Sequence, residues 1–98
     1  MLCGGTSDAK PADAEVQKIC DEVKPQVESQ TNRTYGTFKA VQYKSQMVAG
    51  TNYFIKVHVG GEEYIHLRIF RSLPVHGNEL KVHSVQSPKG QQDEIAYF

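Results

Sequence analysis

The sequence predicts an α+β domain in which one N-terminal helix packs across a four- to five-stranded antiparallel sheet. Apolar residues recur every three to four positions before residue 32, and every second position after residue 34. Glycine, proline and asparagine mark the turns between segments of the second kind. A chain of 98 residues can bury one hydrophobic core without a disulfide framework. We therefore expect a single domain over residues 1–98.

The helix is expected at about residues 13–32. Its apolar stripe has the spacing i, i+3, i+4, i+7 and i+11, and consists of Val16, Ile19, Cys20, Val23 and Val27. Asp13 is the expected N-cap, because its carboxylate can accept hydrogen bonds from free N–H groups of the first turn, and Asn32 is the expected end. Pro25 falls on the side of the helix opposite the stripe, where it would face solvent.

The sheet is expected within residues 34–98, with strands at 37–44, 52–59, 63–71, 80–85 and 94–98. The two central strands alternate, with one apolar face made by Tyr53, Ile55, Val57, Val59, Ile65, Leu67 and Ile69. Pairing Val57 with Ile65 keeps this face together and calls for an odd loop, most simply residues 60–62. Further turns are predicted at residues 76–78 and 87–90, and the helix would cover the single apolar face.

Charge and composition narrow the function classes. The chain has 11 basic and 11 acidic side chains, which removes the electrostatic argument for nucleic acid or an anionic membrane. It shows no leader pattern, lipidation motif or apolar run of about 20 residues. Cys3 and Cys20 are not placed as a structural pair. We expect no nucleic-acid or membrane partner, no cofactor, and a cytoplasmic location with nuclear presence left open.

Three apolar segments break the ordinary patterning. Residues 1–5 are apolar and then glycine-rich, residues 46–50 read Gln-Met-Val-Ala-Gly where a hairpin should turn, and residues 72–76 stay largely apolar where another strand ends. In an antiparallel meander the two hairpin ends lie at the same end of the sheet, and the chain before the helix can reach that end too. Such an edge suits a partner protein with a groove.

These segments carry a resemblance to the cystatins. Residues 46–50 fit the Gln-x-Val-x-Gly loop of that family, Gly4 fits the glycine of its N-terminal trunk, and Leu73-Pro74 fits the second hairpin loop of the stefins, the single-domain intracellular (type 1) branch. The resemblance covers the whole chain and includes VAGTNYFIKVHVG at 48–60, HLRIF at 66–70 and the final Tyr97-Phe98. It implies a cystatin-like fold with a flexible trunk at residues 1–10.

The resemblance also implies a function, namely tight and reversible inhibition of papain-like cysteine proteases, of the type of cathepsins L, S, H and B. The trunk and the two loops would occlude the active-site cleft without covalent chemistry, so the chain would not be an enzyme. The implied protease-binding residues are Leu2, Cys3, Gly4, Gly5, Gln46, Met47, Val48, Ala49, Gly50, Leu73, Pro74, Val75 and His76. Gly4 would let backbone approach the catalytic thiol without a Cβ.

Other interpretations of the same residues stay open at this point. Cys20 beside a histidine could be a hydrolase nucleophile, although a thiol on an apolar stripe is more typical of an inert core residue. His58 and His66 share the outer sheet face as diagonal neighbours and could hold a transition metal, but solvated strand histidines are far commoner, so no metal site is assigned. Cys3, exposed in the flexible start, is either open to oxidation or a simple contact residue.

The oligomeric state and the use of the fold also leave alternatives. A monomer is the expected state. If the turn at Val48 is strained, straightening it would fuse the flanking strands and exchange the helix-containing half between two chains, giving a domain-swapped dimer. A binding module without inhibitory activity on the same fold is the other alternative, and it predicts that removing the start of the chain leaves its activity intact.

Overall fold

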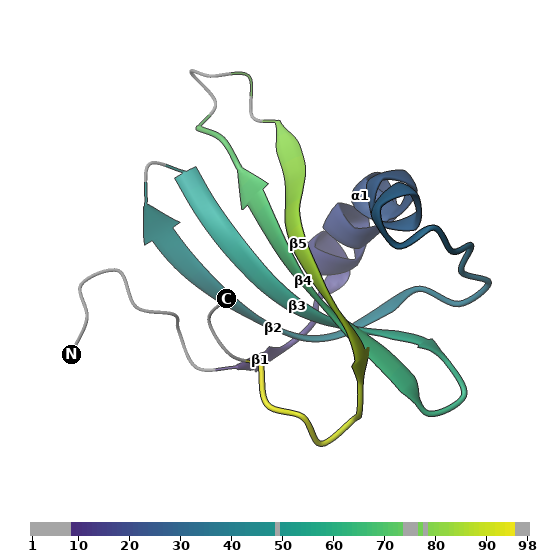
Figure 1. The fold of residues 1–98 in the computed structure, drawn as a ribbon. Coiled ribbons are helices and arrows are strands. Elements are labelled where there is room, and N and C mark those ends of the chain that lie inside the picture. Colours follow the sequence, from purple (N-terminus) through teal and green to yellow (C-terminus); the bar gives the residue numbers. More distant parts are fainter. Residues whose placement is uncertain (1–8, 49, 74–76, 78, 96–98) are drawn as a thin grey trace.

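The computed structural model describes residues 9–48, 50–73, 77 and 79–95, with only the backbone described at Val48 and Pro88. One helix, α1 (Ala14–Thr31), lies across one face of a five-stranded antiparallel sheet (Figure 1). The strands neighbour one another in chain order and are β1 (Lys10–Pro11), β2 (Lys39–Val48), β3 (Gly50–Gly60), β4 (Glu63–Arg71) and β5 (Leu80–Lys89). The predicted α+β class is confirmed.

Helix α1 begins and ends where its sequence predicts. The N–H of Val16 donates to the Asp13 carboxylate over 2.9 Å, and Asn32 ends the helix in the left-handed conformation with a φ of 58°. All five residues of the apolar stripe are buried, whereas Pro25 is exposed. Burial raises the pKa of the Cys20 thiol to about 12, so this cysteine is a core residue and not a nucleophile.

The β3–β4 hairpin has the predicted register but a shorter loop than predicted. Val57 pairs with Ile65, as expected from their shared apolar face. The loop is the two-residue turn at 61–62, since Gly60 already pairs with Glu63, and a register shift between His58 and Gly60 restores the offset. A β-bulge of this kind adds one residue to one strand, and this keeps the apolar face together without the odd loop.

Two predictions for the end of the chain need correction, and one strand was not predicted. Residues 87–90 were expected to turn, yet β5 continues to Lys89 and the turn follows at 91–92. A register shift between Tyr64 and His66 faces Pro88, and an edge strand tolerates proline at such a bulge. Residues 94 and 95 are not in a strand, and 96–98 lie outside the described residues. Strand β1 was missed, because two residues carry no periodicity.

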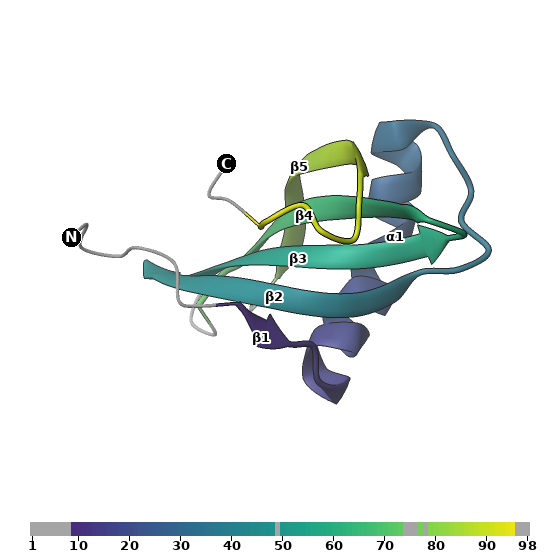
Figure 2. The ribbon, with the colours of Figure 1, turned by 90° about the horizontal axis from the view of Figure 1, so that it is seen from below.

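The outer face of the sheet, on the side away from α1, also carries buried side chains, so the prediction of a single covered face is wrong. Phe54, His66 and Ile95 are buried there, and Figure 2 shows the segment after β5 (yellow) returning across the strands. The Nζ of the buried Lys56 donates to the carbonyl oxygen of Gln91 over 2.7 Å, and this hydrogen bond attaches the segment after β5 to strand β3.

His66 is therefore not the solvated histidine that the sequence suggested. Its side chain is fully buried, and neither ring nitrogen has a hydrogen-bond partner among the described residues. Burial first, and then the positive charges of Lys56 and Lys89, lower the pKa of His66 to about 4. Within the described chain no three side chains of His, Cys, Asp or Glu gather as metal ligands would.

Glutamine side chains of α1 form hydrogen bonds with backbone groups at the start of β2 and on the edge strand β5. The N–H of Ala40 donates to Gln17 over 2.8 Å, and the Gln17 amide donates to the carbonyl oxygen of Phe38 over 3.1 Å. Gln26 does the same at β5, where it accepts from the N–H of Val82 over 3.1 Å and donates to the carbonyl oxygen of residue 80 over 3.2 Å. Each amide thus takes hydrogen bonds that another strand could otherwise form.

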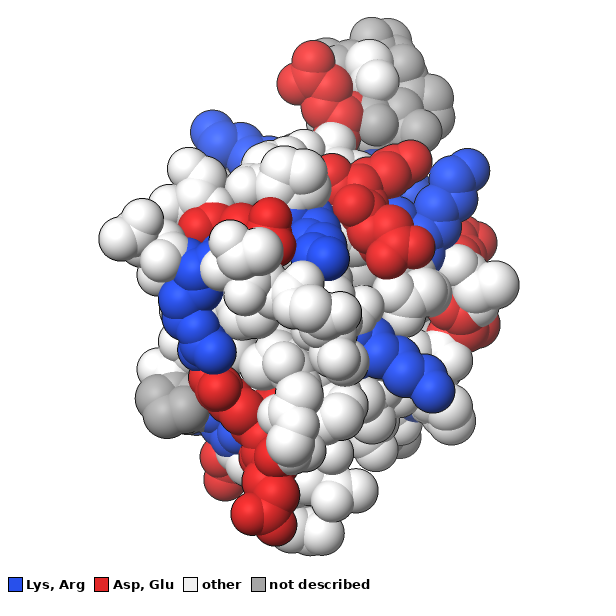
Figure 3. Space-filling view, turned by 90° about the vertical axis from the view of Figure 1, so that its right-hand side faces the viewer, with Lys and Arg blue, Asp and Glu red and all other residues white. Residues whose placement is uncertain are grey.

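The surface charge is mixed. Figure 3, which looks onto the right-hand side of Figure 1, shows basic and acidic side chains interspersed rather than gathered by sign. Arg33 pairs with Glu63 near the β3–β4 turn, and the Arg71 guanidinium lies 3.5 Å from the Glu15 carboxylate. No helix in the described part of the chain has the length and apolar character needed to cross a membrane.

Candidate functional site

The β2–β3 and β4–β5 hairpins end at the same end of the sheet, opposite the turn at 61–62 (Figure 1). Val48 pairs with Gly50 across the first hairpin, and Thr51 pairs with Arg71, which brings Gly50 level with Ser72. We call residues 46–48, 50–51 and 72–73 the hairpin end. Four residues predicted for this region lie outside the described residues, namely Ala49, Pro74, Val75 and His76.

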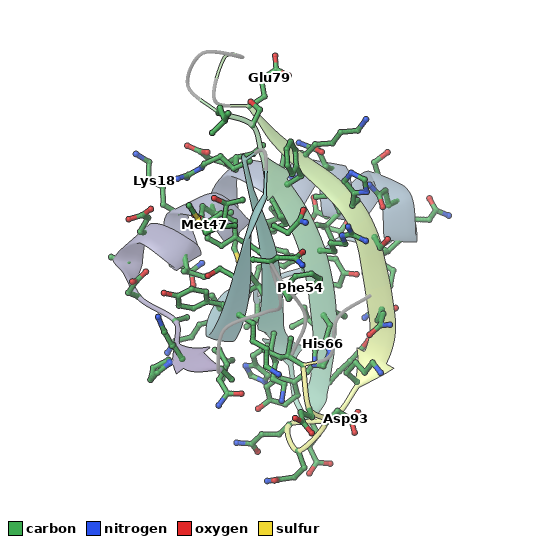
Figure 4. All side chains as sticks on the ribbon, turned by 90° about the vertical axis from the view of Figure 1, so that its left-hand side faces the viewer. Lys18, Met47, Phe54, His66, Glu79 and Asp93 are labelled. Atoms are coloured by element: carbon green, nitrogen blue, oxygen red, sulfur yellow. The ribbon has the colours of Figure 1, made fainter. Side chains whose placement is uncertain are left out.

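Two apolar side chains stand out from the hairpin end. Met47 is 76% exposed and Leu73 is 40% exposed, and these are the exposed large hydrophobic residues of the described chain. Figure 4 places Met47 toward this end of the sheet and Asp93 toward the other, with Phe54 and His66 between them. Both side chains therefore present apolar surface to solvent at the same end of the sheet, the kind of surface that a protein partner can cover.

Side-chain contacts across the first hairpin hold its turn in place. The Nδ2 of the buried Asn52 donates to the Gln46 Oε1 over 3.1 Å, and this pair lies two pairs below the Val48–Gly50 pair at the turn. The Thr51 hydroxyl donates to the Met47 sulfur over 3.7 Å on the next pair. The Gln46 amide is therefore used within the hairpin, where it fixes the pairing beside Met47.

Gly50 joins the first hairpin to the second. Its φ of 127° is in a region that side-chain-bearing residues rarely adopt. A Cβ at this position would lie 2.5 Å from the carbonyl oxygen of Arg71 and 2.7 Å from the Phe70 Cζ, both on β4. Only a glycine allows β3 to begin this close to the end of β4.

Arg71 extends this contact to the helix. Its guanidinium lies 5.7 Å from the ring centroid of Tyr53 and 3.5 Å from a carboxylate oxygen of Glu15 in the first turn of α1. Beyond it, the N–H of Ser72 donates to the carbonyl oxygen of Glu79 over 2.9 Å, and the N–H of Glu79 donates back to the Ser72 hydroxyl over 2.8 Å. These two hydrogen bonds join the two sides of the second hairpin at its base.

The N-terminal end of strand β1 points toward the hairpin end. Lys10 pairs with Tyr43 and Pro11 with Gln42, and the pairing is antiparallel. The N-terminal end of β1 therefore faces along β2 toward Val48. The predicted trunk residues lie outside the described residues, and they are Leu2, Cys3, Gly4 and Gly5.

Sequence reasoning missed the residues that support the hairpin end from below, which are Asn52, Phe70 and Arg71. Asn52 could have been found, because a polar residue at the start of an apolar strand, six positions after Gln46, falls opposite it in a tight hairpin. Phe70 and Arg71 gave no such signal, since their role depends on the register between β3 and β4.

The match to known proteins covers almost the whole chain. The Cystatin domain family matches residues 4–91. The chain is 52% identical to Cystatin-B of Pan troglodytes, with all of both chains covered, and 49% identical to Cystatin-B of Oplegnathus fasciatus, with all of this chain and 98% of the other covered. It is 51% identical to Leukocyte cysteine proteinase inhibitor 1 of Sus scrofa, with all of this chain and 95% of that protein covered. The chain therefore belongs to the cystatin family, in its stefin (type 1) branch.

Proposed function

We propose that this chain inhibits papain-like cysteine proteases by placing its hairpin end, together with the residues before β1, in the active-site cleft. The observation that carries the proposal is the pair of exposed apolar residues, Met47 and Leu73, on two hairpins that Gly50 holds in contact. Members of the cystatin family are protease inhibitors and not enzymes. The relative from Sus scrofa bears the name of a cysteine proteinase inhibitor.

The proposed inhibition needs shape and apolar area, and no chemical step. A turn that is already ordered loses little conformational entropy on binding, so more of the contact energy appears as affinity. The contacts of Gln46 and Gly50 described above supply that order. Gly4 would let the trunk pass the catalytic thiol without presenting a peptide bond in attack geometry. A preorganised interface of about 1,600 Å² commonly gives nanomolar binding or tighter.

Several finer points belong to the same proposal. We propose that the targets are cathepsins of the L, S, H and B type, that the inhibitor acts as a monomer, and that it works in the cytoplasm. The remaining residues proposed to touch the protease are those of the trunk and of the two loop tips, namely Leu2, Cys3, Gly5, Val48, Ala49, Pro74, Val75 and His76.

Titration of papain, with a fluorogenic substrate present, tests the proposal. The full chain should abolish activity at one inhibitor per active site, and activity should return on dilution as the complex dissociates. A chain lacking residues 1–5 should bind more weakly, because it loses the trunk but keeps the hairpin end. A folded monomer that leaves papain and a cathepsin fully active would refute inhibition and leave a binding module on the cystatin fold.

A further inference from the structure

We propose that Phe70 is a positioning residue for inhibition, because its ring is the support on which the β2–β3 turn rests. This inference rests on the proposed function, and it assigns a role to a side chain outside both loops. Phe70 lies in β4 on the outer face of the sheet, opposite Asn52 of β3, and it is half-buried.

The Phe70 ring lies directly against the backbone of Gly50. A Cβ at Gly50 would meet the Cζ and Cε1 atoms of this ring at 2.7 and 2.9 Å. Asn52, the pairing partner of Phe70, holds Gln46 on the other strand of the same hairpin. The two β3 residues beside the ring, Gly50 and Asn52, therefore both belong to the base of the first turn. A smaller side chain at position 70 would remove the contact that supports this base.

The ring is itself held from the opposite side and continues into the second hairpin. His83 of β5 meets it edge-on, with 6.4 Å between the ring centroids. The chain passes from Phe70 through Arg71, which is paired with Glu15, to the exposed Leu73. A ring packed between Gly50 and His83 thus couples the start of β3 to the end of β4, so that Met47 and Leu73 would enter a cleft together.

This arrangement predicts an effect on the lifetime of the complex. Without the ring, the first turn has the same residues but more freedom, so ordering it on binding costs more. Effects of this kind appear mainly in the dissociation rate, because diffusional encounter depends little on the order of one turn.

The chain offers a matched control in Phe54, which is the same residue type on the same face of the sheet. Phe54 is fully buried and lies four positions along β3 from Gly50, opposite Arg68 and away from the hairpin end. Shortening Phe54 should therefore destabilise the fold at least as much as shortening the half-buried Phe70. A general loss of stability would affect both variants, whereas loss of the turn's support would affect one.

The experiment measures association and dissociation rates with papain whose catalytic cysteine is replaced by serine, so that no inhibitor is cleaved. We expect Phe70→Leu to dissociate on the order of tenfold faster than the unchanged chain, and Phe54→Leu to change dissociation by less than about threefold. The milder Phe70→Met provides a second test and should give an intermediate rate. Equal dissociation rates for the two leucine variants would overturn the assignment.

A second readout separates this inference from the proposed function. Should the unchanged chain fail to bind papain, inhibition is refuted while the role of Phe70 in holding the turn is still measurable in the free protein. Amide hydrogen exchange at Gly50 and Thr51 should then be faster in Phe70→Leu than in Phe54→Leu, once each is corrected for global stability. Unchanged exchange at those two amides would overturn the assignment.

Discussion

Gly50 shows how one position can be fixed by two independent constraints. Its positive φ disfavours any side chain, and the space where a Cβ would sit is already occupied by backbone and ring atoms of β4. The sequence motif contains this glycine. The structure shows that a glycine is needed there because of close contacts with β4 as well as the backbone conformation of the turn. Gly50 therefore belongs structurally to both hairpins.

Replacing Gly50 with alanine should lower stability by about 1–3 kcal/mol, because the new methyl group must displace the Arg71 carbonyl and the φ is strained. It should also weaken papain inhibition. Gly36→Ala is the control, since a Cβ there meets nothing within 4 Å. Urea unfolding and inhibition titrations measure both effects, and equal behaviour of the two variants would contradict the packing argument.

The buried imidazole of His66 makes stability depend on pH. Its pKa is about 4 in the folded protein against 6.5 for an ordinary histidine, with Lys56 and Lys89 opposing its charge and Asp93 favouring it. Between these values the unfolded chain binds the extra proton, so the free energy of unfolding falls as the pH drops from about 6.5 toward 4.

This linkage predicts that His66 alone removes about 2 kcal/mol of stability between pH 7 and pH 5. Urea unfolding at the two pH values should show a smaller loss in His66→Gln than in the unchanged chain. His83→Gln, at an exposed position, should keep the full loss. If all three proteins lose the same stability, His66 does not titrate as its burial requires.

At the scale of elements, the helix and the central strands were predictable because their periodicity is long. The five-residue apolar stripe and the alternation from Tyr53 to Ile69 each repeat often enough to define a face. No local sequence pattern predicts strand β1, the β-bulges or the end of β5, because all of these depend on pairing with other strands. The covered outer face was missed for the same reason, since His66 and Lys56 look like surface residues in an alternating strand.

The glutamine contacts of α1 predict how the helix is attached to the sheet. Gln26→Leu removes two hydrogen bonds to the β5 edge and should lower stability by about 1–2 kcal/mol, because the N–H of Val82 and the carbonyl of Leu80 lose their partner. Ser29→Ala, at an exposed position of the same helix, should have little effect. Urea unfolding compares the two, and equal stabilities would show that these bonds do not hold the helix.

For the candidate site, the sequence predicted that the two hairpins end at the same end of the sheet, but not which residues support them. Met47 and Leu73 were predicted and stand exposed at one end of the sheet. The supports beneath them, Phe70 and Arg71, follow only from the pairing of β3 with β4. The predicted trunk and loop tips stay predictions, because they lie outside the described residues.

On the scale of the whole molecule, the sheet has two unlike ends. The hairpin end presents exposed apolar residues and is supported by β4 and by the first turn of α1, through Arg71 and Glu15. The opposite end turns through Gly61 and Glu62 beside the pair of Arg33 and Glu63, and is polar. A partner with an apolar cleft is therefore expected to meet one end and leave the other free.

The most direct test compares amide hydrogen exchange in the free protein and in its complex with papain whose catalytic cysteine is replaced by serine. We predict added protection at residues 46–51 and 72–79, with unchanged exchange at Gly61 and Glu62. Added protection at that opposite turn, with none at the hairpin end, would contradict the proposal that this end fills the protease cleft.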